Sequence, residues 1–393
     1  MSKILKWIFI IITSLILLIY AFNIEYLIKG VRTIYLTGNN TAFISDYEYF
    51  DNREIKSLNP QPWALHKKYN TVVESEALQN LNTGGKTKSF LVIKNDSILF
   101  EKYYDGYDKS SLSNSFSVAK SIVTSMMGKA IMEGKIKGLD QPVSDYFDEY
   151  NEGLASELTV GDLATMSSGM KWSEKYYSVI NITSESYFTK DLRSVILRQK
   201  IIDKPGQGFR YSSGDTQLLG MVIEKATGVS LSDYLTEKFW IPMGAENNAL
   251  WQLDSENYGM EKAYCCIAAT ARDFARFGKL YINKGEWNDE VILDSSFVEL
   301  SIQPSFKDSP YYGYGWWLYD YEGEKVFTMN GHRGQFVISF PEENIIIVRQ
   351  GDFNKKGRVS DGSEETDDDD DVITTGDLYK YMSEGYKLAK SFE

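Results

Sequence analysis

Segments that alternate in the manner of β-strands lie toward both ends of this chain, and segments with helical periodicity lie between them. A hairpin is predicted first, with strands at 89–93 and 97–103. Residues from about 140 to 280 are mostly helical in pattern. After Asn283 the pattern returns to strands, at 314–319, 326–329, 335–340 and 345–350. This order predicts an α+β fold in which one antiparallel sheet is built from both chain ends and flanked by helices, with a mostly helical subdomain inserted.

The first residues resemble a targeting segment. Lys3 and Lys6 precede a run without charge from Trp7 to Phe22. A positive start followed by such a stretch is typical of a signal peptide or a signal anchor. No small-residue cleavage site stands out, so an uncleaved anchor is favoured over a cleaved signal peptide. Residues 4–24 would form this anchor in the cytoplasmic membrane. By the positive-inside rule, the remainder of the chain is then expected outside the cytoplasm, in the periplasm or at the cell surface.

Composition limits the class of protein. The chain has 393 residues, of which 43% are hydrophobic and 25% are charged, as in globular proteins. Its net charge of -13 argues against nucleic-acid binding. An acidic segment at 360–371 is interpreted as a solvated surface loop. The expected organisation is a signal or anchor at 1–25, an irregular extracytoplasmic lead-in at 26–88 and a main domain at 89–393.

Cysteine and histidine are scarce. Cys265 and Cys266 are the two cysteines, and adjacent cysteines rarely bridge each other, so they are interpreted as unbridged packing residues. His66 and His332 are the two histidines, which makes a zinc site of the His/Cys type unfavourable. No Gly-x-Ser-x-Gly sequence is present, which disfavours a Ser-His-Asp hydrolase. A catalyst in this chain must therefore work without histidine as its main base, and we expect no metal site.

A helix is predicted to begin at Ser117. Apolar residues follow it at helical spacing, at Val118, Ile122, Val123, Met126 and Met127. Asn114 and Ser115 are plausible N-cap residues. Lys120 lies three residues after Ser117, so the two side chains can meet on the helix. A buried lysine with a lowered pKa can take the proton of a serine hydroxyl, and the N–H groups at a helix start can stabilise an oxyanion.

A second Ser-x-x-Lys sequence runs from Ser168 to Lys171. Gly169 lies inside it and no apolar helix follows, so we interpret it as a loop or a helix end.

Two further motifs follow the first in a fixed order. After Ser117-Val-Ala-Lys120 come Tyr211-Ser-Ser213 and His332-Arg-Gly334. This set resembles the Ser-x-x-Lys, Tyr-x-Asn and Lys/His-x-Gly motifs of the family of class C β-lactamases, penicillin-binding DD-peptidases and esterases. It looks most like the 6-aminohexanoate-dimer (nylon oligomer) hydrolase branch. The resemblance runs from about residue 45 to the C-terminus and implies a β-lactamase/DD-peptidase-like fold, a serine hydrolase and no cofactor.

The resemblance also implies roles for individual residues. Ser117 would be the nucleophile, with Lys120 and Tyr211 sharing one proton as acid and base. The nearby ammonium would lower the pKa of Tyr211. Backbone N–H groups of Ser117 and Gln335 would form the oxyanion hole. The residues expected to contact substrate are Tyr176, Ser213, His332, Arg333 and Gly334.

Each residue of the third motif has chemical properties that suit a role in binding substrate. His332 or Arg333 could orient a substrate carboxylate, Arg333 by a bidentate contact. Gly334 would let an edge strand present an N–H to a substrate carbonyl.

One departure affects the expected substrate. Ser213 stands where β-lactamases have Asn, which argues against efficient β-lactam hydrolysis. The function expected is hydrolysis of a small ester, amide or peptide through an acyl-enzyme on Ser117. The alternatives are a DD-peptidase or β-lactamase, and a slowly deacylating or non-catalytic binding protein on the same fold. Ser117, Lys120 and Tyr211 are all present, which favours an enzyme.

Overall fold

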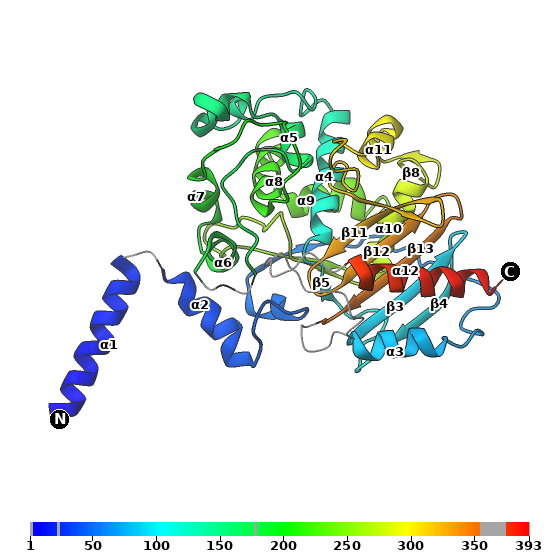
Figure 1. The fold of residues 1–393 in the computed structure, drawn as a ribbon, viewed down its shortest axis with the longest axis horizontal. Coiled ribbons are helices and arrows are strands. Elements are labelled where there is room, and N and C mark those ends of the chain that lie inside the picture. Colours follow the sequence, from blue (N-terminus) through cyan, green and yellow to red (C-terminus); the bar gives the residue numbers. More distant parts are fainter. Residues whose placement is uncertain (1–2, 22–23, 177, 179, 354–374, 393) are drawn as a thin grey trace.

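A large sheet made from both ends of the chain organises the fold (Figure 1). The computed structural model describes residues 3–21, 24–176, 178, 180–353 and 375–392. Seven described strands form the sheet, in the order β10 (Trp317–Tyr321), β11 (Glu324–Gly331), β12 (Gln335–Phe340), β13 (Ile345–Gly351), β3 (Thr87–Lys94), β4 (Ser97–Tyr103) and β2 (Ala64–Leu65). Neighbouring strands are antiparallel except β2 and β4, which are parallel. The predicted α+β class and the sheet built from both ends are confirmed.

Alternation along the strands buries both faces of this sheet. In β3, Phe90 and Val92 pack with α3 (Glu76–Gly84) and α12 (Thr375–Lys390) on one face. Leu91 and Ile93 point to the opposite face, where α4 (Val118–Met132) and α10 (Ala271–Ile282) pack. The sheet therefore lies between two helical layers.

Helices joined by loops run through the region between α4 and α10, on the side of the molecule where α5 to α8 lie in Figure 1. The described helices there are α5 (Val160–Ala164), α6 (Ile182–Phe188), α7 (Leu192–Leu197), α8 (Ser213–Thr227) and α9 (Leu231–Leu235), followed after α10 by α11 (Ser295–Ser301). Short helical turns are η1 (Tyr35–Thr37), η2 (Asp46–Tyr49), η3 (Val143–Asp145), η4 (Asp148–Tyr150), η5 (Gly153–Glu157) and the π-helical η6 (Thr236–Trp240). Helix α8 ends at Gly228, whose φ of 77° supplies the left-handed stop.

A second sheet, which the sequence pattern did not predict, brings distant segments together. Its order is β1 (Asn52–Ile55), β6 (Ala249–Gln252), β7 (Ile267–Ala269) and β5 (Ser113–Asn114). A separate hairpin joins β8 (Glu286–Trp287) to β9 (Glu290–Val291). Because β7 belongs to this sheet, α10 begins only at Ala271. Strand β5 leads directly into α4.

Residues 26–88, expected to be irregular, contain α2 (Tyr26–Thr33), β1, β2 and α3. Tertiary packing accounts for α2, which lies against α6. A Cβ at Gly30 would lie 3.3 Å from the Phe188 ring, so glycine permits this close approach. The helix α1 (Lys3–Ala21) precedes α2. Among the residues that the structure describes, no helix has the length and apolar character needed to cross a membrane. The acidic segment at 360–371 lies outside the described residues.

Candidate active site

Ser117 lies at the N-terminal end of α4, where the chain leaves β5. Ser117 itself occupies the N-cap position, and its side chain makes no capping hydrogen bond. The N-cap expected at Asn114 or Ser115 is therefore wrong, because pairing of β5 with β7 holds Asn114 in a strand. Phe116 turns the chain with a φ of 46°, a conformation that costs energy in a residue with a side chain. Ser117 follows this turn directly and lines the cavity described below.

Lys120 reaches Ser117 as the helical spacing predicts. Its Nζ lies 2.9 Å from Ser117 Oγ and donates to the carbonyl oxygen of Tyr264 at 2.8 Å. The Lys120 side chain is buried, and this burial lowers its pKa to about 8, against an opposing effect of the Glu174 charge. A substantial fraction of Lys120 is therefore neutral near pH 8 and able to take the Ser117 proton.

Tyr211 completes the group around Ser117. Its ring centroid lies 5.0 Å from Lys120 Nζ and 5.6 Å from the Trp317 ring of β10. Burial and then the Glu174 charge raise the pKa of Tyr211, while a hydrogen bond with Ser117 lowers it. The expected lowering of this pKa is wrong, since burial outweighs the stabilisation of a phenolate. The phenol remains protonated and can act as an acid.

Glu174 is a residue of the site that the sequence analysis missed. Its carboxylate accepts the Ser213 N–H at 2.5 Å and the Ser213 hydroxyl at 3.0 Å. It also accepts the Tyr176 hydroxyl at 2.5 Å. Glu174 therefore links two residues expected to contact substrate. The signal in the sequence was its position two residues before Tyr176, but nothing there indicated that it would meet Ser213.

His332 lies between aromatic rings at the edge of the cavity. Its ring stacks on Tyr176 with centroids 5.1 Å apart and meets Phe116 edge-on at 5.5 Å. Burial, and then the positive charge of Arg333, lower the pKa of His332 to about 3. His332 is therefore neutral above that pH, so it could orient a substrate carboxylate only as a neutral N–H donor and not as a cation.

Arg333, Gly334 and Gln335 form the turn behind His332. Arg333 pairs with Asp352 at 2.6 Å, so its guanidinium is committed to the protein. A Cβ at Gly334 would lie 2.3 Å from the Arg349 guanidinium, and Gly334 has a φ of 82°. Gln335 begins β12, which lies between β11 and β13 and is not the edge strand that was expected. These three residues are not among the described residues that line the cavity.

Gly331 brings this turn to the start of α4. A Cβ at Gly331 would lie 2.2 Å from the carbonyl oxygen of Ser115, two residues before Ser117. A side chain at this position would push the third motif away from Ser117. Because glycine has no side chain, the segment at Gly331 can lie against the segment at Ser115, although the two are more than 200 residues apart in the sequence.

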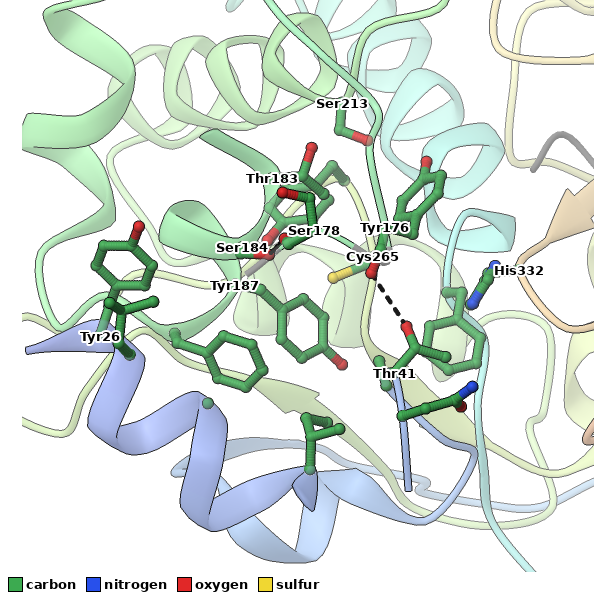
Figure 2. Close-up of a pocket in the computed structure, with 18 of the residues that line it drawn as sticks. Tyr26, Thr41, Tyr176, Ser178, Thr183, Ser184, Tyr187, Ser213, Cys265 and His332 are labelled. Carbon is green, nitrogen blue, oxygen red and sulfur yellow. Dashed lines mark hydrogen bonds between the residues drawn. The ribbon is translucent and has the colours of Figure 1, made fainter. Parts of the chain in front are cut away.

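A cavity of about 340 Å³ opens at Ser117. Tyr176, Ser213, Cys265 and His332 also line it, and Figure 2 shows these side chains around it together with the hydrogen bond from Thr41 to the Tyr176 carbonyl. Four of the residues expected to act or bind are thus brought to one cavity, with Lys120 and Tyr211 beside Ser117.

Cys265 and Cys266 differ from expectation in one respect. Both are buried, as predicted for packing residues, but the structure joins them in a disulfide. A sharp turn between adjacent cysteines can bring their sulfur atoms together, and Cys266 has a φ of 76°.

The second Ser-x-x-Lys sequence lies in a loop after α5, as predicted. Ser168 is buried, and its hydroxyl donates to Asp215 Oδ1 at 2.7 Å. Burial raises the pKa of Asp215 to about 7, while hydrogen bonds from Ser212 and Ser168 oppose the rise. Lys171 is exposed. No group of three His, Cys, Asp or Glu side chains in the described part of the chain is placed to hold a metal ion.

The protein-family model described as Beta-lactamase matches residues 80–369. This chain belongs to the beta-lactamase family. It is 25% identical over 291 residues to the 6-aminohexanoate-dimer hydrolase of Paenarthrobacter ureafaciens, covering 67% of this chain and 72% of that protein. It is also 26% identical over 167 residues to Protein flp of Staphylococcus aureus, covering 39% of this chain and 33% of that protein.

Solved structures of the family share the fold. A candidate 6-aminohexanoate-dimer hydrolase from Bacillus anthracis superposes with a TM-score of 0.73 at 22% identity, covering 88% of this chain and 92% of that one. A class C beta-lactamase superposes with a TM-score of 0.57 at 17% identity, covering 83% of this chain and 99% of that one. The family assignment identifies this chain as a serine hydrolase related to the beta-lactamases, with the fold that the motifs implied.

Proposed function

We propose that this serine hydrolase cleaves a small ester or amide through an acyl-enzyme on Ser117. The observation that carries the proposal is the 2.9 Å contact between Lys120 Nζ and Ser117 Oγ. The lysine in that contact is buried and has a pKa of about 8, which suits a general base. A serine hydroxyl requires such a base to become a strong nucleophile.

Acylation would use a neutral Lys120 amine and a protonated Tyr211 phenol. Neutral Lys120 takes the proton of Ser117 as Oγ bonds to the substrate carbonyl carbon. The resulting oxyanion would be held by the backbone N–H of Ser117 at the start of α4. Gln335, expected to supply the second N–H, is not among the described residues that line the cavity, so its part in this step stays a prediction. As the tetrahedral intermediate collapses, Tyr211 gives its proton to the leaving group and recovers one from the Lys120 ammonium. The leaving alcohol or amine departs neutral, and the acyl group remains on Ser117.

Deacylation would repeat these steps with water. Lys120, neutral again, takes a proton from water as its oxygen bonds to the acyl carbon. Collapse of the second intermediate breaks the bond to Ser117 Oγ, which takes the proton back. All protons then return to their starting groups, and the acid is released.

Linear esters and amides are favoured over β-lactams as substrates. In this site Ser213 donates its hydroxyl to Glu174. An Asn side chain at that position binds the acylamide group in β-lactamases, and a serine engaged with Glu174 does not replace it. Slow acylation by penicillins with little turnover is the expected behaviour.

The test is intact-mass spectrometry of the full chain after reaction with a fluorophosphonate probe. We expect one adduct on the wild type and none on Ser117→Ala. Ser168→Ala is the matched control, because it removes the serine of the other Ser-x-x-Lys sequence and should still be labelled. Failure to label folded wild type, or labelling of Ser117→Ala, would contradict the mechanism. A separate assay with p-nitrophenyl acetate distinguishes an enzyme from a slowly deacylating binding protein. An enzyme turns the ester over repeatedly, whereas a slowly deacylating protein releases one burst of nitrophenol and then stops.

We further propose that residues 1–25 export the catalytic domain and anchor it in the cytoplasmic membrane. The support is the sequence itself, in which Lys3 and Lys6 precede the uncharged run from Trp7 to Phe22. A fusion of residues 1–30 to a phosphatase that is active only outside the cytoplasm should be active and sediment with membranes. An inactive fusion would contradict export.

A further inference from the structure

Helix α2 contributes an apolar face to the cavity at Ser117. Leu27, Gly30, Val31 and Ile34 all line it, with spacings of three and four residues that place them on one side of a helix. Figure 2 shows α2, which carries Tyr26, on the side of the cavity away from Ser213 and His332. A substrate group that extends from Ser117 toward α2 would therefore contact hydrocarbon.

Aromatic rings form the adjoining walls. Tyr187 and Phe188 come from α6, and Phe116 precedes the nucleophile. Gly30 lets α2 approach Phe188 closely, because a Cβ there would already lie 3.3 Å from the ring. The helix is held against the catalytic domain by this packing.

The described side chains that line the cavity include no Asp, Glu, Lys or Arg. His332 is neutral, since its pKa is lowered to about 3 by burial and by Arg333. The polar groups of the described lining residues are uncharged: hydroxyls such as those of Thr41 and Ser184, the Asn40 amide and the His332 imidazole. The Glu174 carboxylate is not among the lining residues and already accepts hydrogen bonds from Ser213 and Tyr176. A charged substrate end would lose its hydration here and meet no opposite charge among the lining side chains, which is strongly unfavourable.

This wall lies outside the part of the chain that the family model matches. The match begins at residue 80, whereas α2 and the following residues to Ala42 that line the cavity precede it. Selectivity from this wall is therefore a property of the N-terminal segment of this chain.

We infer that the cavity binds an uncharged, apolar acyl group of the substrate, and that residues 26–42 determine this selectivity. The inference rests on the proposed hydrolysis at Ser117. Each buried methylene favours binding by about fourfold. Medium-length aliphatic esters should thus be better substrates than short ones, and charged groups of equal length should be poor ones.

Three p-nitrophenyl esters with the same six-carbon acyl chain test the chemical class. They are the hexanoate, the 6-aminohexanoate and the mono-ester of adipate, which end in a methyl, an ammonium and a carboxylate. We expect kcat/KM for the hexanoate to exceed that for each charged ester, and that for the acetate, by at least about tenfold. A charged ester used as well as the hexanoate would overturn the inference.

Two substitutions on α2 test the location. Val31 and Ile28 are each 47% exposed, but only Val31 is among the residues that line the cavity. Val31→Trp should lower the hexanoate-to-acetate ratio of kcat/KM at least fivefold by filling the cavity, and Ile28→Trp should leave that ratio unchanged. Equal ratios in the two variants would overturn the role of α2.

The outcomes separate the two proposals. Fluorophosphonate labelling of Ser117 with acetate hydrolysis, but without chain preference, leaves the proposed function standing and overturns the selectivity. Absence of both labelling and hydrolysis overturns the proposed function, and the selectivity inference falls with it.

Discussion

The carboxylate of Glu174 accepts the backbone N–H of Ser213 at 2.5 Å, at the first residue of α8. An anion at a helix N-terminus is stabilised by the helix dipole and the unpaired N–H groups. Because Glu174 also accepts the Tyr176 hydroxyl, it ties the loop that carries Tyr176 to the helix that follows Tyr211. Its charge partly offsets the effect of burial, which lowers the pKa of Lys120, and adds to the effect of burial, which raises the pKa of Tyr211. One carboxylate thus positions the cavity wall and affects the proton balance at Ser117.

Activity should rise with pH, with a midpoint near 8. Burial lowers the pKa of Lys120 to about 8, so its neutral form, which takes the Ser117 proton, increases through that pH. Tyr211 has a raised pKa and stays protonated over the same range. The check is kcat/KM for p-nitrophenyl acetate from pH 6 to 9.5, with spontaneous hydrolysis subtracted. A flat or falling profile would exclude Lys120 as the base.

Replacement of Glu174 by Gln should shift that midpoint to lower pH. The negative charge of Glu174 stabilises the Lys120 ammonium, and its removal favours the neutral amine. The measurement is the same pH profile, compared with Glu152→Gln, which removes a charge from an exposed residue. An unchanged midpoint in Glu174→Gln, or a shift to higher pH, would show that Glu174 acts on geometry alone.

Ser168→Ala should lower stability without removing activity. The Ser168 hydroxyl is buried and donates to Asp215, and loss of such a bond costs about 1–3 kcal/mol of the free energy of unfolding. Ser117→Ala should show the opposite result, with activity lost and stability changed by about 1 kcal/mol or less, because Ser117 makes no capping bond. Urea denaturation and esterase assays on both variants provide the comparison. Loss of kcat in Ser168→Ala as severe as in Ser117→Ala would mean that the wrong serine has been assigned.

Gly331→Ala should impair both folding and catalysis. The added Cβ would lie 2.2 Å from the Ser115 carbonyl oxygen, so β11 or the start of α4 must move. Overpacking of this kind costs about 1–3 kcal/mol. We expect a lower midpoint in urea and slower fluorophosphonate labelling of Ser117. Gly138→Ala is the control, because a Cβ at Gly138 meets nothing within 4 Å. Equal labelling rates in the two variants would show that the turn does not support the site.

The sequence by itself predicted the main sheet and the candidate nucleophile. Alternation and helical spacing are local properties, so strands at both ends and the pairing of Ser117 with Lys120 three residues later could be predicted. The order of three motifs indicated the family. These conclusions require only residues that are near one another in the chain, or motifs that keep a fixed order along it.

Tertiary structure decided which groups meet and which protons they hold. Glu174 reaches Ser213 across 39 residues, and Arg333 turns to Asp352 instead of a substrate. Burial depends on packing from the whole chain, so the raised pKa of Tyr211 and the lowered pKa of His332 could not be predicted from neighbours in sequence. The apolar wall from α2 likewise exists because Gly30 packs against Phe188, a long-range contact that no local pattern indicates.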